Sequence, residues 1–225
     1  MEDQLIYKLS NREAFIRKAT EAIASCLNES IEEQGTAHVL LSGGSTPGPI
    51  YKKLADDFEQ LSKVKIGLVD ERFVETSSEF SNERLLRECF SGAASADQNI
   101  EGMVHDTKDQ QNNLRLLNQK YELFTKRIDL VVLGMGGDGH TASIFPNDPS
   151  SDEARSSEAP FFNTLAPVNP QQRITFGMPL LCRAKHIFIF ITGEKKLDVL
   201  NDSSAQLPIH ELMGRRNDIK LFYTE

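Results

Sequence analysis

The sequence has no tryptophan and only three cysteines among 225 residues. Cys26, Cys89 and Cys182 lie far apart, form no CxxC pair and leave an odd count. These features argue against a disulfide framework and indicate reduced thiols in a cytoplasmic protein. Because Cys89 and Cys182 each stand among apolar neighbours, we expect them to pack in the interior rather than to act in catalysis.

Positive charge is also scarce. Lys and Arg number 25 against 33 Asp and Glu, which gives a formal charge of −8 and an isoelectric point near 5.2. A surface that binds a phosphate backbone needs a clustered excess of basic residues, so we expect no nucleic-acid partner. An acidic protein can still bind an anion locally.

Long apolar runs are missing as well. No stretch approaches the roughly 20 apolar residues that cross a bilayer. The first residues, Met1 to Gln4, lack the basic start and the apolar segment of a signal peptide. We therefore expect no membrane partner and a cytoplasmic location.

What the chain does contain is a series of short apolar runs, at residues 37–41, 64–69, 128–133 and 186–191. Such runs, rich in Leu, Val and Ile and without polar alternation, are typical of strands covered on both faces. No repeat, low-complexity tract or interdomain linker is visible. We predict a single domain over residues 1–225 with three α/β/α layers and a mostly parallel, Rossmann-like central sheet.

Two further segments carry local predictions. A capping box formed by Ser10 and Glu13 is expected to open a helix over residues 11–33, whose apolar residues recur at helical spacing. The polar segment 147–153 is interpreted as a mobile flap over a site.

The strongest sign of chemistry is the stretch from Leu133 to Pro146. An apolar strand runs directly into Gly134, Gly136, Gly137, Asp138, Gly139 and His140. Glycines let the backbone approach a ligand closely, and an imidazole titrates near neutrality. An ordinary turn needs neither this density of glycine nor the His, so we interpret the stretch as part of a functional site.

A second glycine-containing loop, Ser42 to Pro47, follows the first predicted core strand and precedes a helix. Its hydroxyl groups, free backbone N–H groups and helix N-terminus are typical of a phosphate site, although the same composition occurs in plain turns. The spacing is neither GxxxxGK[ST] nor GxGxxG, so it indicates neither a nucleoside triphosphate nor a dinucleotide.

Charged residues follow two other predicted strands. Asp70, Glu71 and Arg72 end one of them, and Lys196 comes shortly after the run 186–191. Charge runs are usually solvated, but the carboxyl ends of parallel strands meet at one edge of a sheet, where ligands bind. We expect these side chains to lie near both glycine-rich loops.

Taken together, these motifs resemble the 6-phosphogluconolactonase family, within the group that also contains glucosamine-6-phosphate deaminase. The resemblance is carried by residues 41–47, 70–72 with 81–82, 133–146, 173–175, and 193 with 196, in the order of the family. The match over 133–146 is the specific one, and the landmarks cover most of the chain.

The resemblance implies hydrolysis of 6-phospho-D-glucono-1,5-lactone to 6-phosphogluconate in the pentose phosphate pathway, with a sugar-phosphate lactone as the small-molecule partner. It implies neither a metal nor an organic cofactor. We expect a monomer or a homodimer, and the sequence does not distinguish between them. His140 would be the general base, with Asp138 beside it, and Arg72 would stabilise the oxyanion. The substrate phosphate would lie against the phosphate loop, at Gly43, Gly44, Ser45 and Thr46, with Arg173 and Lys196 supplying charge beside it. Asp70 is also implied in substrate binding.

Two alternatives stay open. One is a glucosamine-6-phosphate isomerase or deaminase, because that family is similar to this chain in the phosphate loop, in Asp70 and in the Asp-Gly-His turn. The resemblance also implies, however, that this family needs a Glu where this chain has Phe145. Since Phe cannot transfer a proton, the lactonase interpretation is favoured. A non-catalytic sugar-phosphate sensor would need the phosphate site but no base, and the presence of His140 with Asp138 counts against it.

Overall fold

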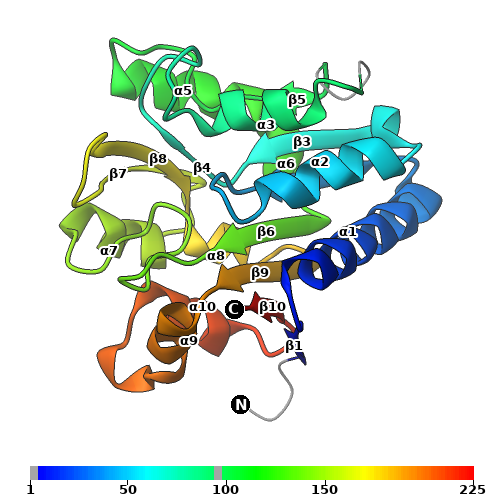
Figure 1. Ribbon diagram of the computed structural model, residues 1–225. Helices are drawn as coiled ribbons and strands as arrows, with labels where there is room; N and C mark the ends of the chain where they lie inside the picture. Colours follow the sequence, from blue (N-terminus) through cyan, green and yellow to red (C-terminus); the bar gives the residue numbers. More distant parts are fainter. Residues whose placement is uncertain (1–4, 94–97) are drawn as a thin grey trace.

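The computed structural model describes residues 5–93 and 98–225. A seven-stranded sheet runs through this part of the chain (Figure 1), with the order β1-β10-β9-β6-β2-β3-β5 and parallel pairing of neighbours. Its strands are β1 (Leu5–Lys8), β2 (Ala37–Leu41), β3 (Val64–Leu68), β5 (Ile100–Glu101), β6 (Leu130–Gly134), β9 (His186–Thr192) and β10 (Lys220–Thr224).

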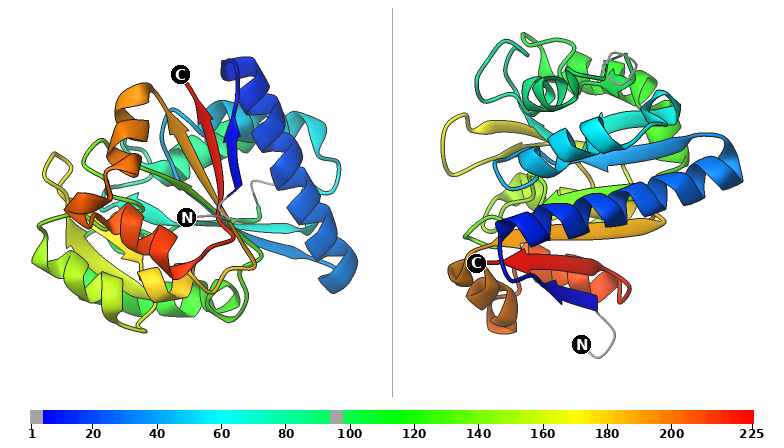
Figure 2. Two further views of the ribbon diagram at one scale, coloured as in Figure 1. Left: turned by 90° about the horizontal axis from the view of Figure 1, so that it is seen from below. Right: turned by 45° about the vertical axis from the view of Figure 1, so that its right-hand side comes forward.

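Helices cover both faces of this sheet. The long helix α1 lies on one side and α10 on the other (Figure 2), and α1, α2 and α3 pack side by side. The helices are α1 (Arg12–Gln34), α2 (Gly48–Asp57), α3 (Asn82–Phe90), α5 (Gln110–Lys120), α6 (Glu122–Lys126), α7 (Pro149–Ser156), α8 (Met178–Leu181), α9 (Glu194–Asn201) and α10 (Pro208–Arg215), with short 3₁₀ turns η1 (Leu61–Lys63) and η2 (Ser203–Ala205). The predicted α/β/α layering and parallel sheet are confirmed. No helix in the described ranges is long and apolar enough to cross a membrane.

A second, antiparallel sheet was not predicted. It joins β4 (Asp70–Arg72), β8 (Gln172–Phe176) and β7 (Phe161–Leu165) in that order. The chain passes from one sheet to the other at Val69, whose N–H donates to Leu41 O and whose carbonyl accepts from Phe176 N. The charged residues 70–72 are therefore a strand of their own rather than the end of β3.

One local prediction is wrong, and a second is not tested. The N-cap of α1 is Asn11, whose side chain accepts a hydrogen bond from Ala14 N, so the capping box of Ser10 and Glu13 does not form. The polar segment after Pro146 contains the helix α7, which was not predicted, and its role as a mobile flap stays a prediction. Asp148 caps this helix and Pro149 occupies its first position, which explains how a polar sequence forms it.

The carboxyl ends of the central strands point toward one side of the molecule, where β4, β8, α7 and α9 also lie (Figure 1). The turns that follow β2, β6 and β9 leave the sheet at this edge. This is the position at which open parallel sheets bind their ligands.

Candidate active site

The loop between β2 and α2, residues 42–47, forms one wall of a cavity of about 240 Å³. The helix α2 begins at Gly48 without a side-chain cap. The buried hydroxyl of Ser42 has no hydrogen-bond partner in the described part of the chain. Gly44 has a φ of +106°, which L side chains rarely adopt. The loop thus brings unused donors to a helix N-terminus, as an anion site requires.

The cavity also collects groups from the turns after β6 and β9 and from β4. Its lining includes Gly43, Gly44, Ser45, Thr46, Asp70, Arg72, Asn82, Met135, His140, Ala142 and Lys196. The sequence therefore predicted correctly that the two glycine-rich loops and the charges of β4 lie together.

A second hollow of about 300 Å³ adjoins the first and shares Asp70, Arg72, His140 and Ala142 with it. Asp138, Ser143, Phe145, Pro167, Val168 and Arg173 also line this second hollow. Arg173, which we expected beside the phosphate loop, lies here on the other side of His140 and Arg72.

His140 and Asp138 form a side-chain pair at the boundary of the two hollows. Nδ1 of His140 lies 2.5 Å from Oδ1 of Asp138, and this oxygen also accepts from the His140 backbone N–H at 3.2 Å. Burial acts to raise the pKa of Asp138, but hydrogen bonds from His140 and its charge hold that pKa below its ordinary value. An ionised Asp138 assigns the proton of the neutral ring to Nδ1. Nε2 then carries the free lone pair.

The backbone beneath this pair has no room for a side chain. A Cβ built on Gly136 would lie 2.1 Å from His140 Cε1 and 2.6 Å from Asp138 Oδ1. The His140 ring also contacts the ring of Phe145, and the two ring centroids lie 4.7 Å apart. The imidazole is therefore held between backbone and an apolar ring.

Asp70 contributes a buried carboxylate to both hollows. Ser143 Oγ donates to its Oδ2 at 2.5 Å, and Ser143 itself accepts at its carbonyl from Thr164 Oγ1 at 2.6 Å. Asn82 Nδ2 donates to the backbone carbonyl of Asp70 at 2.9 Å. These bonds tie the turn after β6 and the start of α3 to the same strand.

Arg72 and Arg173 are cross-strand partners on β4 and β8. The guanidinium of Arg72 donates to Phe80 O at 2.6 Å. Arg173 is only 6% exposed and forms no ion pair with any described residue. Burial and the neighbouring charge of Arg72 lower its pKa to about 10, so it remains a cation at neutral pH. The charges of Asp70 and Glu71 act on Arg173 and oppose this shift, but neither Arg72 nor Arg173 forms an ion pair with a described residue. Two adjacent cations of this kind are arranged to bind an anion.

Lys196 lies in the first turn of α9 and lines the first cavity. Burial lowers its pKa, while the charge of Asp138 opposes that shift. Its ammonium forms no hydrogen bond or ion pair with the residues that the structure describes. Gly193, with a φ of +88°, makes the turn that brings α9 back over the sheet edge.

Sequence reasoning missed three residues of the site. Asn82 was recognised only as a landmark, and Ser143 only as part of the glycine-rich stretch. Arg12, at the start of α1, donates to Ser45 O at 3.4 Å and was not considered at all. No local pattern signals such contacts, because each depends on segments far apart in the sequence.

A group of His, Cys, Asp or Glu side chains suited to a metal ion does not occur within residues 5–93 and 98–225. The three cysteines are free, and burial raises the pKa of Cys89 and Cys182. Cys89 is buried in the core, as the sequence predicted, whereas Cys182 is only half-buried at the edge of the core, and neither lines the two hollows.

A parallel α/β sheet carries at one edge a loop that leads into a helix without a side-chain cap, a His–Asp pair, and cations that form no ion pair with the described residues. This combination defines a class of proteins that bind small phosphorylated ligands. Residues 10–219 match the model of the family described as glucosamine-6-phosphate isomerases/6-phosphogluconolactonase. The chain belongs to this family.

Relatives with known names support the same placement. A 6-phosphogluconolactonase of Pseudomonas aeruginosa is 32% identical over 81% of this chain and 78% of its own length. One from Neisseria meningitidis is 30% identical over 97% of this chain and 98% of its own. The crystal structure of a 6-phosphogluconolactonase from Shewanella baltica superposes with a TM-score of 0.91 at 28% identity, covering 100% of this chain and 99% of that one. A monomeric glucosamine-6-phosphate deaminase, at 15% identity and a TM-score of 0.80, shares the fold.

Proposed function

We propose that this protein is a 6-phosphogluconolactonase that hydrolyses 6-phospho-D-glucono-1,5-lactone to 6-phosphogluconate. The observation that carries the proposal is the His140–Asp138 pair, in which Nδ1 is held by a carboxylate and Nε2 is left free in a cavity with an anion loop. Membership of the family and the names of its relatives at about 30% identity support the same activity.

In the proposed reaction, His140 Nε2 takes a proton from a water molecule as its oxygen bonds to the lactone carbonyl carbon. The carbonyl oxygen becomes an oxyanion, which Arg72 and backbone N–H groups of the glycine-rich turn stabilise. Collapse of this intermediate breaks the bond to the ring oxygen, which receives the proton from His140. Asp138 stays ionised and stabilises the transient imidazolium.

Substrate binding is proposed to use charges on both sides of His140. The phosphate would bind the loop at Gly43, Gly44, Ser45 and Thr46, with Lys196 facing it across the first cavity. Arg173 would add positive charge from the second hollow, and the buried carboxylate of Asp70 would accept hydrogen bonds from sugar hydroxyl groups. A local cluster of cations thus accounts for an anionic substrate in an acidic protein.

The deaminase alternative is disfavoured by Phe145. Its side chain packs against the His140 ring and is 5% exposed. A Phe side chain cannot transfer a proton, and its burial leaves no room for a water molecule that could do so at this position. A non-catalytic sensor would not require a free imidazole nitrogen within the anion site.

The experiment that tests the proposal offers the protein freshly made 6-phosphogluconolactone and, separately, glucosamine-6-phosphate. We expect enzyme-dependent lactone hydrolysis above the spontaneous rate and no release of ammonia from the amino sugar. Turnover of the amino sugar alone would favour the deaminase, and binding of 6-phosphogluconate without turnover of either would favour the sensor.

The role of His140 is tested with His140→Ala. We expect kcat to fall by about a thousandfold or more, with the affinity for 6-phosphogluconate changed by less than about tenfold, because a general base acts mainly in the transition state. His186→Ala, at the amino end of β9, is the matched control and should retain wild-type turnover. Wild-type turnover by His140→Ala would remove His140 from the mechanism.

A further inference from the structure

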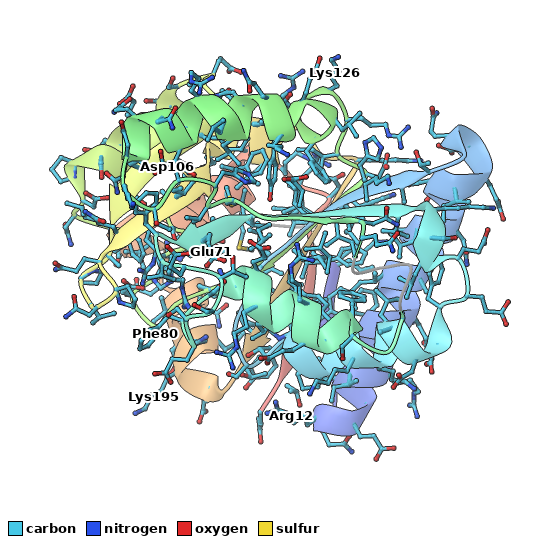
Figure 3. The ribbon with its side chains drawn as sticks, turned by 90° about the horizontal axis from the view of Figure 1, so that it is seen from above. Arg12, Glu71, Phe80, Asp106, Lys126 and Lys195 are labelled. Atoms are coloured by element: carbon cyan, nitrogen blue, oxygen red, sulfur yellow. The ribbon has the colours of Figure 1, made fainter. Side chains whose placement is uncertain are left out.

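Glu71 lies between the acidic and basic residues of β4 but faces away from both hollows. Its side chain is enclosed between β4 and the beginning of α3 (Figure 3), and the residue is 1% exposed. Phe80, by contrast, lies at the edge of the molecule in the same view. A Glu side chain is seldom buried this deeply unless its carboxylate is paired with other groups.

All the hydrogen-bond neighbours of this carboxylate are donors. Oε1 accepts from Arg72 N at 2.7 Å and from Asn82 N at 2.8 Å. Oε2 accepts from Ser81 Oγ at 3.0 Å and from Glu83 N at 2.7 Å. Burial raises the pKa of Glu71 to about 7, while these four hydrogen bonds act to lower it. Every acceptor position is occupied, and two of the donors are N–H groups of the first turn of α3.

The bonds connect three parts of the site. Asn82, whose N–H is held by Glu71, donates through Nδ2 to Asp70 O. Its Oδ1 lies against the phosphate loop so closely that a Cβ on Gly43 would come within 1.9 Å of it. The same carboxylate holds the backbone N–H of Arg72, whose guanidinium lines both hollows.

We propose that Glu71 is a positioning residue: it fixes Asn82 against the phosphate loop and fixes the backbone of Arg72, and so sets the spacing between the phosphate and the oxyanion side of the site. This inference rests on the proposed function for the identity of the ligand. Glu71 acts through Asn82 and Arg72 and makes no contact with the substrate.

The test replaces Glu71 by Gln, which preserves the shape but turns one acceptor into a donor that faces other donors. We expect kcat/KM for the lactone to fall by roughly tenfold to a hundredfold, because small displacements of binding and reacting groups are costly. The affinity for 6-phosphogluconate and for inorganic phosphate, measured by calorimetry on folded protein, should fall with it.

Glu83→Gln is the matched control. Glu83, on α3, is another buried acidic residue, and its side chain accepts hydrogen bonds from Arg87 and Thr76 rather than from any group lining the hollows. It should lose stability without losing affinity. If Glu71→Gln, at a temperature where it is folded by circular dichroism, kept wild-type kcat/KM and phosphate affinity, the positioning role would be wrong.

A double-mutant cycle separates positioning from a general loss of structure. If Glu71 acts on phosphate binding through Asn82, then Glu71→Gln should weaken phosphate binding by less than about twofold once Asn82→Ala is present. Full additivity of the two changes would overturn the inference. The binding measurements remain valid even if the wild-type protein does not turn over the lactone, so failure of the proposed function is seen separately.

Discussion

At the scale of single residues, we expect one added methyl group at Gly136 to have a large effect on catalysis. Gly136→Ala would place a methyl group about where the His140 ring and the Asp138 carboxylate now lie. We expect the ring to shift and kcat to fall on the order of a hundredfold. Affinity for 6-phosphogluconate should change little, because the loop 42–47 is not displaced.

Gly137→Ala provides the control for this prediction. A Cβ at Gly137 meets no atom within 4 Å, so this variant should retain near wild-type kcat. Both rates are measured in the lactone assay, with spontaneous hydrolysis subtracted. Equal activity of the two alanine variants would show that the His140–Asp138 pair does not depend on the backbone beneath it.

The sequence predicted the residues of this pair and that Asp138 lies beside His140, and the structure adds that the contact is made through Nδ1 of the ring. The density of Gly, Asp and His in residues 134–140 was sufficient to indicate a site, because chemistry of this kind is local in sequence. Asn82 and Ser143 could not be assigned, since their contacts to Gly43 and Asp70 exist only after distant segments fold together. Arg173 was expected at the phosphate loop, but its strand β8 pairs with β4 and places it in the second hollow.

At the scale of elements, α7 depends on its cap. Asp148 accepts hydrogen bonds from Ser150 and Ser151 and from Leu165 N, and so ties α7 to β7. Burial acts to raise the pKa of Asp148, but these hydrogen bonds lower it below its ordinary value. A carboxyl group with a lowered pKa stabilises the fold above the pKa of the unfolded chain and loses this contribution as pH falls.

Asp148→Ala should therefore lower the free energy of unfolding by about 1–2 kcal/mol at neutral pH. The difference from wild type should shrink as the pH falls below about 4, where the carboxyl group of the unfolded chain becomes protonated before that of the folded protein. Urea denaturation across this range measures both effects. Asp152→Ala, an exposed position on the same helix, should change stability by less than about 0.5 kcal/mol. A pH-independent difference would mean that the charge of Asp148 does not contribute.

The elements that sequence predicted best are the buried parallel strands. β2, β3, β6 and β9 begin and end within two residues of the predicted runs, because burial on both faces leaves an unbroken apolar pattern. The small sheet gave no such pattern, since β4 has three charged residues and depends on pairing with β8. The helix α7 was missed because its polar sequence carries no apolar stripe.

At the scale of the whole molecule, Tyr121 joins the two sheets. Its hydroxyl accepts from Leu68 N at 3.0 Å and donates to Glu101 O at 2.6 Å, on β3 and β5 of the large sheet. Its ring packs against Phe161 and Phe176 of the small sheet. Because one buried residue holds strands of both sheets, we propose that the chain unfolds as a single cooperative unit, as the prediction of one domain requires.

Tyr121→Phe tests this. Removing the hydroxyl leaves a buried N–H and a carbonyl without their partner, so we expect a loss of about 2–4 kcal/mol in the free energy of unfolding. Tyr223→Phe is the control: its hydroxyl has no hydrogen bond to any described residue, and stability should change by less than about 0.5 kcal/mol. Urea unfolding is followed by circular dichroism for the sheets and helices and by binding of 6-phosphogluconate for the site. In both the wild type and Tyr121→Phe the two signals should give one common midpoint, lower in the variant. Loss of binding at a lower urea concentration than loss of secondary structure would instead show that the small sheet, with Arg72 and Arg173, unfolds separately from the parallel sheet.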